Sequence, residues 1–382
     1  MAATCWSATS SLRVSTCGNG AGAGKPARLE GLAAGARTLT AAALTLGYSY
    51  RRFDWSTGED ERHTAVTSDG WKLALYRYRA RGRAHPYPVL CSHGMAGSRF
   101  IYDLHPDYSL ARYLSGRGFD TWLVDLRGRG ESWPEAGPDR ALQWTFDDLA
   151  ERDLPAAVAR VCEITGAPQA FWVGMEMSGQ ALYAAAIQGK AGLVRGAVTC
   201  GSPVLTDSAA LVPGVTAAPR MSVRGRVPFR SGARMAGPIL AYGRSHALES
   251  SFRSCNTAPL VSARYFRNGI PDEAASLVDQ FKTWIDEGTM RNLDGSVVYS
   301  DRLEEVKLPL LVMAAGSDLQ RPAESVRAAY DAFGSTDKTF LHAGVSDGFS
   351  VDFGHDDLLA GYASPTEIFP LVNDWLANRS DS

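Results

Sequence analysis

The chain has 382 residues, of which 45% are hydrophobic and 21% are charged, and its formal net charge at pH 7 is −2. This composition is typical of a globular protein with enough apolar material for a large core. A charge near zero gives no electrostatic reason to expect nucleic acid or an anionic membrane as a partner. The length suits one large α/β domain with an insertion, because α/β folds often exceed about 200 residues as a single unit.

The N-terminal segment, residues 1–55, differs in composition from the rest of the chain. Up to Phe53 it contains one acidic residue, Glu30, against six Arg or Lys, and it is rich in Ala, Ser, Thr and Gly. These features are typical of an organellar transit peptide, so we predict a plastid location first and a mitochondrial one second. A disordered extension is the alternative, because it would have a similar composition. The apolar run 40–46 is too short to cross a bilayer, so we expect no integral membrane span and leave peripheral membrane contact open.

The six cysteines show no Cys-x-x-Cys pair and no Cys/His spacing of the kind that binds metal. Cys91, Cys162 and Cys200 fall within apolar runs, where a cysteine is usually a buried reduced thiol. We therefore expect a reducing compartment, no metal and no organic cofactor.

Strands and helices alternate after residue 64. A hairpin is expected over residues 64–78, with Ser68-Asp69-Gly70 as its turn. Short apolar runs predict buried strands, and amphipathic patterns between them predict helices. The predicted strands are 88–91, 121–124, 171–174, 196–200, 308–315 and 338–341, and the helices are 110–114, 147–165, 323–333 and 366–377. This alternation implies an α/β fold with a mostly parallel central sheet, helices on both faces and ligands beyond the carboxyl ends of the strands.

The alternation lapses between residues 204 and 306, which we interpret as a lid inserted between core segments 56–203 and 307–382. The lid contains a helical pattern at 274–287 and several aromatic and apolar side chains, namely Phe229, Met235, Ile239, Leu240, Tyr242, Tyr265 and Phe266. Such side chains predict a mainly apolar pocket for a lipophilic or terpenoid-sized molecule. For the arginines between 220 and 234 we expect a solvated basic loop, with binding of a carboxylate or phosphate head as the alternative.

The segment 171–183 carries the most informative motif. An apolar strand ends at Gly174 and passes into a helix of small residues, as in the nucleophile elbow Gly-x-Ser-x-Gly, a strained turn that lifts its central side chain above the sheet. The central residue here is Glu176. The motif therefore predicts the fold, while its chemistry departs from the usual serine.

Taken in order, the motifs of residues 65–375 resemble those of the α/β-hydrolase superfamily. His93-Gly94 follows the third strand, where the family forms half of its oxyanion hole, and the run 125–132 follows the fourth strand, as in lipase-like and esterase-like members. Glu176 occupies the elbow. Asp318 and His355 then follow at positions similar to the family's acid and histidine sites, and nucleophile, acid, histidine is the chain order of this fold.

The resemblance assigns further roles. Asp318 is expected to accept a hydrogen bond from His355 and fix its tautomer, although Asp352, Asp356 and Asp357 also lie close to the histidine in sequence. The backbone N–H groups of Met95 and Met177 are the expected oxyanion donors. Relatives that open epoxides place lid tyrosines over the substrate oxygen, a role for which Tyr242 and Tyr265 are candidates.

Glu176 leaves three interpretations open. Its carboxylate could attack carbon and form an ester that water activated by His355 hydrolyses, as relatives with aspartate at this position do. Glutamate is one methylene longer than aspartate, which displaces the reacting oxygen by about 1.5 Å and can lower the rate about a hundredfold. Glu176 could instead be a general base or an electrostatic partner of a protonated His355. In the third interpretation catalysis is lost and Glu176 is a polar anchor for a bound ligand.

Ser178 is an alternative nucleophile in a shifted register. That register places Glu176 and Gln180 where the turn needs small residues, so we favour Ser178 as a replacement for the small residue two positions after the elbow. A serine-type ester hydrolase acting through Ser178 remains the corresponding alternative function.

We therefore predict a plastid-targeted α/β-hydrolase-fold enzyme of lipid metabolism that acts on a lipophilic small molecule through Glu176, His355 and Asp318. Hydrolysis of an ester or epoxide and non-hydrolytic acid–base chemistry both fit these residues. The competing class is a catalytically inactive binding or interaction protein that kept the fold. The pairing of His355 with Asp318 favours an enzyme, because a binding protein has little need of it.

Overall fold

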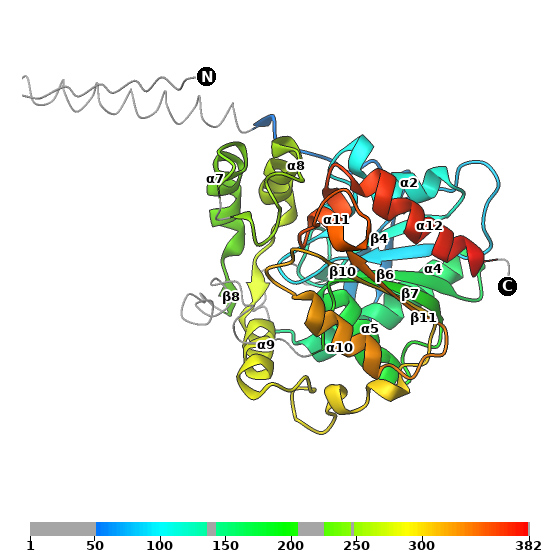
Figure 1. Cartoon of the computed structure of the whole chain (residues 1–382). Coiled ribbons are helices and arrows are strands. Elements are labelled where there is room, and N and C mark those ends of the chain that lie inside the picture. The colour runs from blue at the N-terminus through cyan, green and yellow to red at the C-terminus, as the bar shows by residue number, and fades with distance from the viewer. Residues whose placement is uncertain (1–50, 136–142, 205–224, 246–247, 381–382) are drawn as a thin grey trace, which may run out of the picture. The chain divides into compact units, whose positions relative to one another are not determined.

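The computed structural model describes residues 51–135, 143–204, 225–245 and 248–380 (Figure 1). The chain divides into two units, residues 1–52 and 53–382, and the description below concerns the second. Residues 1–50 of the predicted transit peptide and the first part of the arginine-rich run, up to residue 224, lie outside the described residues. Among the residues that are described, no helix has both the length and the apolar character needed to cross a membrane.

A nine-stranded sheet forms the centre of the molecule. Its strands are β1 (Glu61–Val66), β2 (Trp71–Tyr78), β3 (Val89–Ser92), β4 (Thr121–Asp125), β5 (Trp133–Pro134), β6 (Ala170–Met175), β7 (Val194–Cys200), β10 (Leu310–Ala315) and β11 (Lys338–Ala343). Their order is β1-β2-β4-β3-β6-β7-β10-β11, with β5 paired to β2. The pairs from β4 to β11 are parallel, and those of β2 with β1, β4 and β5 are antiparallel. The predicted mostly parallel sheet is confirmed.

Alternate residues of the central strands point to opposite faces of the sheet, and each face is covered by its own helices. Leu90, Trp172 and Val312 pack with α4 (Leu154–Thr165), α5 (Met177–Ile187) and α10 (Ala323–Ala332). Cys91 and Val173, one residue further along their strands, pack with α2 (Leu110–Gly116) and α12 (Phe369–Asn378) on the other face. The central strands are apolar throughout because both faces are buried.

Two predicted helices contain widened turns. The helix expected at 147–165 comprises α3 (Phe146–Asp148), the π-helical stretch η3 (Leu149–Asp153) and α4, and the helix expected at 366–377 is preceded by a π-helical stretch at Ser364–Ile368. Proline explains the irregularity, because it lacks an N–H and its ring crowds the carbonyl four residues earlier. Pro155 lies at the start of α4 and Pro365 within the second stretch. The predicted burial of Cys91, Cys162 and Cys200 is confirmed.

The segment predicted as a lid contains a second, two-stranded sheet and helices of its own. These are β8 (Arg226–Val227), β9 (Glu273–Ala274), α7 (Phe229–Tyr242), α8 (Pro259–Arg264), the π-helical stretch η7 (Tyr265–Gly269) and α9 (Ala275–Glu287). Helices α7 and α8 lie side by side, apart from the layers of the main sheet, and α9 lies below them (Figure 1). A short helix, α11 (Asp357–Ala360), follows the predicted catalytic histidine.

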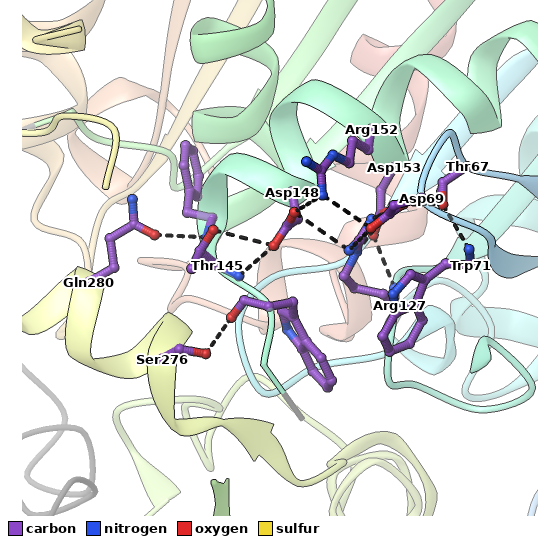
Figure 2. Close-up of polar contacts among 12 residues, drawn as sticks. Thr67, Asp69, Trp71, Arg127, Thr145, Asp148, Arg152, Asp153, Ser276 and Gln280 are labelled. Atoms are coloured by element: carbon purple, nitrogen blue, oxygen red, sulfur yellow. Dashed lines mark hydrogen bonds and ion pairs between the residues drawn. The ribbon is translucent and has the colours of Figure 1, made fainter. Parts of the chain in front are cut away.

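A buried arginine, Arg127, ties the hairpin to the helical layer (Figure 2). Its Nη2 lies 2.6 Å from the carboxylate of Asp153, and its Nη1 lies 2.9 Å from that of Asp69 in the β1–β2 turn. The guanidinium is desolvated, with 2% of the side chain exposed. In the same view α9 is fixed to the core, where Gln280 accepts a hydrogen bond of 2.9 Å from the Phe146 N–H.

We predict that Arg127→Met lowers the free energy of unfolding by about 3–5 kcal/mol, because it leaves Asp153 as an uncompensated buried charge. The matched control is Arg152→Met. Arg152 pairs with the same Asp69, but 42% of its side chain is exposed, so the expected loss is below about 1 kcal/mol. Urea unfolding of both variants measures the difference, and equal losses would contradict the assigned role of Arg127.

Candidate functional site

The elbow forms where β6 passes into α5. Glu176 has φ 48° and ψ −110°, a sparsely populated conformation for a side-chain-bearing residue, with a cost of about 1–3 kcal/mol. Close packing around the turn demands small residues. A Cβ on Gly174 would lie 2.6 Å from the Trp172 Nε1, and one on Gly179 would lie 2.2 Å from the Ser202 Oγ. The structure thus places Glu176 at the centre of the turn.

The carboxylate of Glu176 reaches the loop after β3. Its Oε2 accepts a hydrogen bond of 2.8 Å from the backbone N–H of Met95, the predicted oxyanion donor. A Cβ on Gly94 would lie 2.9 Å from the same oxygen, so the missing side chain of Gly94 provides the space for it. Glu176 consequently occupies the position in which a reacting oxyanion would meet the Met95 amide.

The other carboxylate oxygen of Glu176 is bound by Arg321. Both Nε, at 3.2 Å, and Nη2 of the guanidinium donate to Oε1, and both side chains are buried. Burial raises the pKa of Glu176, but the charge of Arg321, the Met95 N–H and the nearby His355 outweigh it, so the pKa lies below its ordinary value. Glu176 is therefore an anion with hydrogen bonds on both oxygens at neutral pH.

His355 and Asp318 form a buried pair beside this carboxylate. The Nδ1 of His355 lies 2.7 Å from the Asp318 Oδ2, which fixes Nε2 as the nitrogen that can exchange a proton with a bound molecule. Burial lowers the pKa of His355, but Asp318, Asp356 and Glu176 outweigh it and raise the pKa to about 9. The imidazole is consequently protonated at neutral pH.

The Asp318 turn also positions Arg321. The other oxygen of Asp318, Oδ1, accepts hydrogen bonds of 2.8 Å from the backbone N–H groups of Gln320 and Arg321. Arg321 thus follows the acid by three residues within one tight turn. The acid that orients His355 and the cation that binds Glu176 come from a single loop after β10.

The third acid at the site is Asp356, which neighbours His355 in sequence and lines the same cavity. Burial raises its pKa to about 7, with Asp318 and Glu176 contributing and His355 opposing. Asp357 instead lies in the first turn of α11 and does not line the cavity. Of the acids near His355, Asp318 is the one that binds Nδ1.

A cavity of about 250 Å³ lies over these groups, between the carboxyl ends of the central strands and the segment predicted as a lid. Its polar floor is made by Glu176, Arg321, His355 and Asp356, and its walls are mainly apolar, including Ile101, Phe229, Tyr265, Phe266, Ile270 and Phe281. A mainly apolar cavity with a few converging polar groups is the usual form of a small-molecule site.

The remaining predicted site residues lie in different places. Tyr265 lines the cavity, whereas Tyr242 lies on α7 with 48% of its surface exposed and its ring 5.5 Å from Phe53. Met177 is the first residue of α5 and packs in the core. Ser178 is fully buried, donates to the carbonyl of His93 and does not line the cavity. The structure therefore does not bring Ser178 or Tyr242 to His355.

Buried polar contacts hold the Met95 loop in place. The Nε2 of His93 accepts from the Leu126 N–H at 3.1 Å, and its Nδ1–H donates to the Gly94 carbonyl at 2.9 Å. Burial lowers the pKa of His93 to about 4, so its ring is neutral and structural. From the lid, Glu273 accepts from the Ala96 N–H at 3.2 Å and pairs with the buried Arg129.

Sequence reasoning missed Arg321, Glu273 and the position of Asp356 in the cavity. A signal existed for Arg321, because a buried Glu176 requires a cation and Arg321 directly follows the predicted acid turn. For Glu273 there was none, since its partner Arg129 lies 144 residues away in sequence. Within the described part of the chain, no group of three or more His, Cys, Asp or Glu residues could hold a metal ion.

Comparison with known proteins identifies the family of the chain. The model of the alpha/beta hydrolase fold matches residues 87–344. The chain belongs to this family. Similar curated proteins are Lipase 1 of Drosophila melanogaster, 31% identical over 143 residues that cover 36% of this chain and 30% of that protein, and Lipase member K of Mus musculus, 35% identical over 127 residues that cover 30% and 31%. The matched region thus spans about a third of these lipases.

Solved structures give the same fold. A monoglyceride lipase of Saccharomyces cerevisiae aligns with a TM-score of 0.56 at 18% identity, over 85% of this chain and 96% of that one. In this chain a buried histidine–aspartate pair lies beside a glutamate at the turn between β6 and α5, and Arg321 binds that glutamate.

We predict that Arg321→Met destabilises the protein by about 3–5 kcal/mol at pH 8, because the buried Glu176 carboxylate loses the guanidinium that binds it. Without Arg321 the pKa of Glu176 in the folded protein rises above its value in the unfolded chain. A carboxyl group with such a raised pKa lowers the free energy of unfolding as the pH increases towards that pKa. The deficit relative to the parent should therefore shrink between pH 8 and pH 5, which urea unfolding at both pH values measures.

Two further variants control for this result. Arg327→Met removes an exposed arginine whose partner is Asp331, and we expect a change below about 1 kcal/mol. The double variant Arg321→Met/Glu176→Gln removes both charges and should recover most of the stability. If the double variant is as unstable as Arg321→Met, charge pairing is not the cause.

Proposed function

We propose that this α/β-hydrolase-fold chain is an enzyme that acts on a lipophilic small molecule by acid–base chemistry, without a covalent enzyme intermediate. The observation that carries the proposal is the environment of Glu176. One of its oxygens is bound by the Met95 amide and the other by two nitrogens of Arg321.

The position of Oε1 argues against a nucleophilic role for Glu176. An attacking oxygen must approach the substrate carbon to about 3–3.5 Å with its orbital aligned, and Oε1 is the oxygen that Arg321 holds. The lowered pKa of Glu176 also weakens its nucleophilicity. The hydrogen bond from the Met95 N–H to Oε2 is compatible with the covalent mechanism as well, because it would stabilise the hydrolysis of a covalent ester. The choice between the covalent and the non-covalent mechanism therefore depends on Oε1.

His355 is the group best placed to transfer a proton. It lines the cavity, its orientation is fixed by Asp318, and its raised pKa of about 9 makes it an imidazolium at neutral pH. An imidazolium can donate a proton to the oxygen of a bound ester or epoxide as a general acid while water attacks the carbon and the carbon–oxygen bond breaks. The proton that the attacking water releases then restores the imidazolium. Glu176 and Arg321 then form a fixed charged floor that orients the polar group of that molecule.

Two observations support a lipophilic substrate. The cavity walls are mainly apolar, and several similar curated proteins are lipases, among them the gastric triacylglycerol lipase of Homo sapiens. A role in lipid metabolism and an ester or epoxide as the reacting group are part of this proposal.

Turnover in ¹⁸O-labelled water tests whether the mechanism is covalent. We expect that turnover of a lipophilic epoxide, such as 1,2-epoxydodecane, leaves the peptide that contains Glu176 unlabelled. A covalent ester would be hydrolysed by attack of water on the Glu176 carboxyl carbon and would place ¹⁸O in that side chain. Mass spectrometry of the digested enzyme reads the result, and label in this peptide would contradict the proposal.

Labelling with a fluorophosphonate probe supplies the controls. The parent and Ser178→Ala should not react, whereas Glu176→Ser should, because it joins a serine to the His355–Asp318 pair. Glu176→Ser/His355→Gln should be silent. Reaction of the parent that Ser178→Ala abolishes would establish the serine hydrolase alternative instead.

A second candidate is a binding protein without catalysis. One observation favours it: Glu176 occupies the Met95 amide that would stabilise an oxyanion, and loss of one such donor costs about 10²–10³ in rate. Binding of decanoic esters without turnover, unchanged in His355→Gln, would support this candidate over the enzyme.

We also propose that the protein works in a plastid, or second in a mitochondrion, on the composition of residues 1–55. A fluorescent reporter fused behind residues 1–55 should enter plastids of plant cells. The control replaces Arg13, Arg28 and Arg37 by Glu, which removes the positive charge typical of transit peptides, and should stay in the cytosol. A cytosolic location of the unmodified fusion would refute the prediction.

A further inference from the structure

A second cavity, of about 610 Å³, lies next to the site and is lined by arginines. Four of them come from the lid: Arg226 from β8, Arg230 and Arg234 from α7, and Arg267 from η7. Arg230 and Arg234 are four residues apart and therefore share one face of α7. We call this space the arginine cavity. These side chains surround a hollow, which is the basis for considering a binding site here in addition to the expected solvated basic segment.

The positive charge of the arginine cavity is only partly neutralised. Arg267 pairs with Asp54 at 2.8 Å, and Arg226 lies 3.5 Å from Asp272. Among the described residues, the side chains of Arg230 and Arg234 have no carboxylate within ion-pair distance. Burial lowers the pKa of Arg234, and the charges of Arg267 and Arg230 lower it further. Repulsion between these arginines is relieved by an anion bound among them.

The arginine cavity adjoins the apolar cavity of the site. Ile270 lines both of them, so the two cavities are direct neighbours. A molecule that spans them would place an apolar tail over Glu176 and a charged head among the arginines. Guanidinium groups match the acceptor oxygens of phosphate in geometry and charge. A phosphate carries up to two negative charges, which can balance the positive charges of Arg230 and Arg234.

We propose that the arginine cavity binds a phosphate group, and that the lipophilic molecule acted on at the site is a phosphate-bearing amphiphile. The second part depends on the function proposed above. The first part concerns phosphate chemistry alone, which an amphiphile or a free phosphate ion can supply.

Isothermal titration of the full chain with three probes tests both parts. Dodecyl phosphate carries head and tail, dodecanol carries the tail alone, and inorganic phosphate carries the head alone. We expect dodecyl phosphate to bind about tenfold or more tightly than dodecanol, because charge-assisted bonds to arginine add to apolar burial. Its affinity should fall with rising salt, while that of dodecanol should not.

Arginine variants locate the binding. Arg230→Gln/Arg234→Gln should weaken dodecyl phosphate about tenfold or more, since it removes two charge-assisted contacts, and should leave dodecanol unchanged. Arg327→Gln, on α10 away from both cavities, is the matched control and should change neither. Circular dichroism confirms that each variant is folded.

The remaining outcomes separate the two proposals. If inorganic phosphate binds and Arg230→Gln/Arg234→Gln weakens it while dodecanol does not bind, the arginine cavity is a site for free phosphate and the lipophilic site fails. If dodecyl phosphate and dodecanol bind equally, or the double variant binds dodecyl phosphate like the parent, the arginine cavity is not a phosphate site. Absence of binding by every phosphate probe has the same meaning.

Discussion

The carboxylate of Glu176 connects three parts of the molecule that meet at this site. It links the elbow to the loop after β3 through the Met95 amide and to the loop after β10 through Arg321. A buried anion is tolerated only where hydrogen bonds and an opposite charge replace water. Glu176 therefore requires Arg321, and the Asp318 turn that orients His355 also presents Arg321. A change at the elbow has consequences for the whole constellation.

This dependence determines which chemistry the site supports. In a serine hydrolase of this fold, the space beside the Met95 amide is kept for the oxyanion of the substrate. Here a side chain fills that space, with Gly94 providing room for it. The nearby anions hold His355 in its protonated form, which suits proton donation better than activation of a nucleophile. The fold is shared with lipases, while the polar groups are the basis of the different reaction that we propose.

The segment predicted as a lid contributes both apolar and charged residues to the two cavities. Its apolar residues close the cavity over Glu176, and Glu273 reaches back to the Met95 loop and to Arg129. Its arginines surround the neighbouring cavity. These contacts combine apolar volume and positive charge on one side of the molecule, which fits an amphiphilic ligand better than a purely apolar one.

Much of the fold could be predicted from the sequence. Apolar runs located the central strands, glycines and helix patterns located the elbow, and the order of the motifs predicted the neighbourhood of Glu176, Asp318 and His355. Helix irregularities at Pro155 and Pro365 were not predicted, because apolar periodicity locates a helix and its buried face but not the hydrogen-bond pattern of each turn. Residues 204–306 were predicted to form a lid from the absence of alternation, which gave no information about their internal arrangement.

The sequence by itself determined the fold family, the elbow and the replacement of its serine by glutamate, because these depend on local patterns and on their order along the chain. Only the tertiary structure decided what the glutamate contacts, that Ser178 faces the core, that Tyr265 rather than Tyr242 lines the cavity, and that the lid arginines surround a hollow. The physical reason is that these properties arise from side chains distant in sequence, such as Glu176 and Arg321, 145 residues apart. Their charges interact only after the sheet brings its strand ends together.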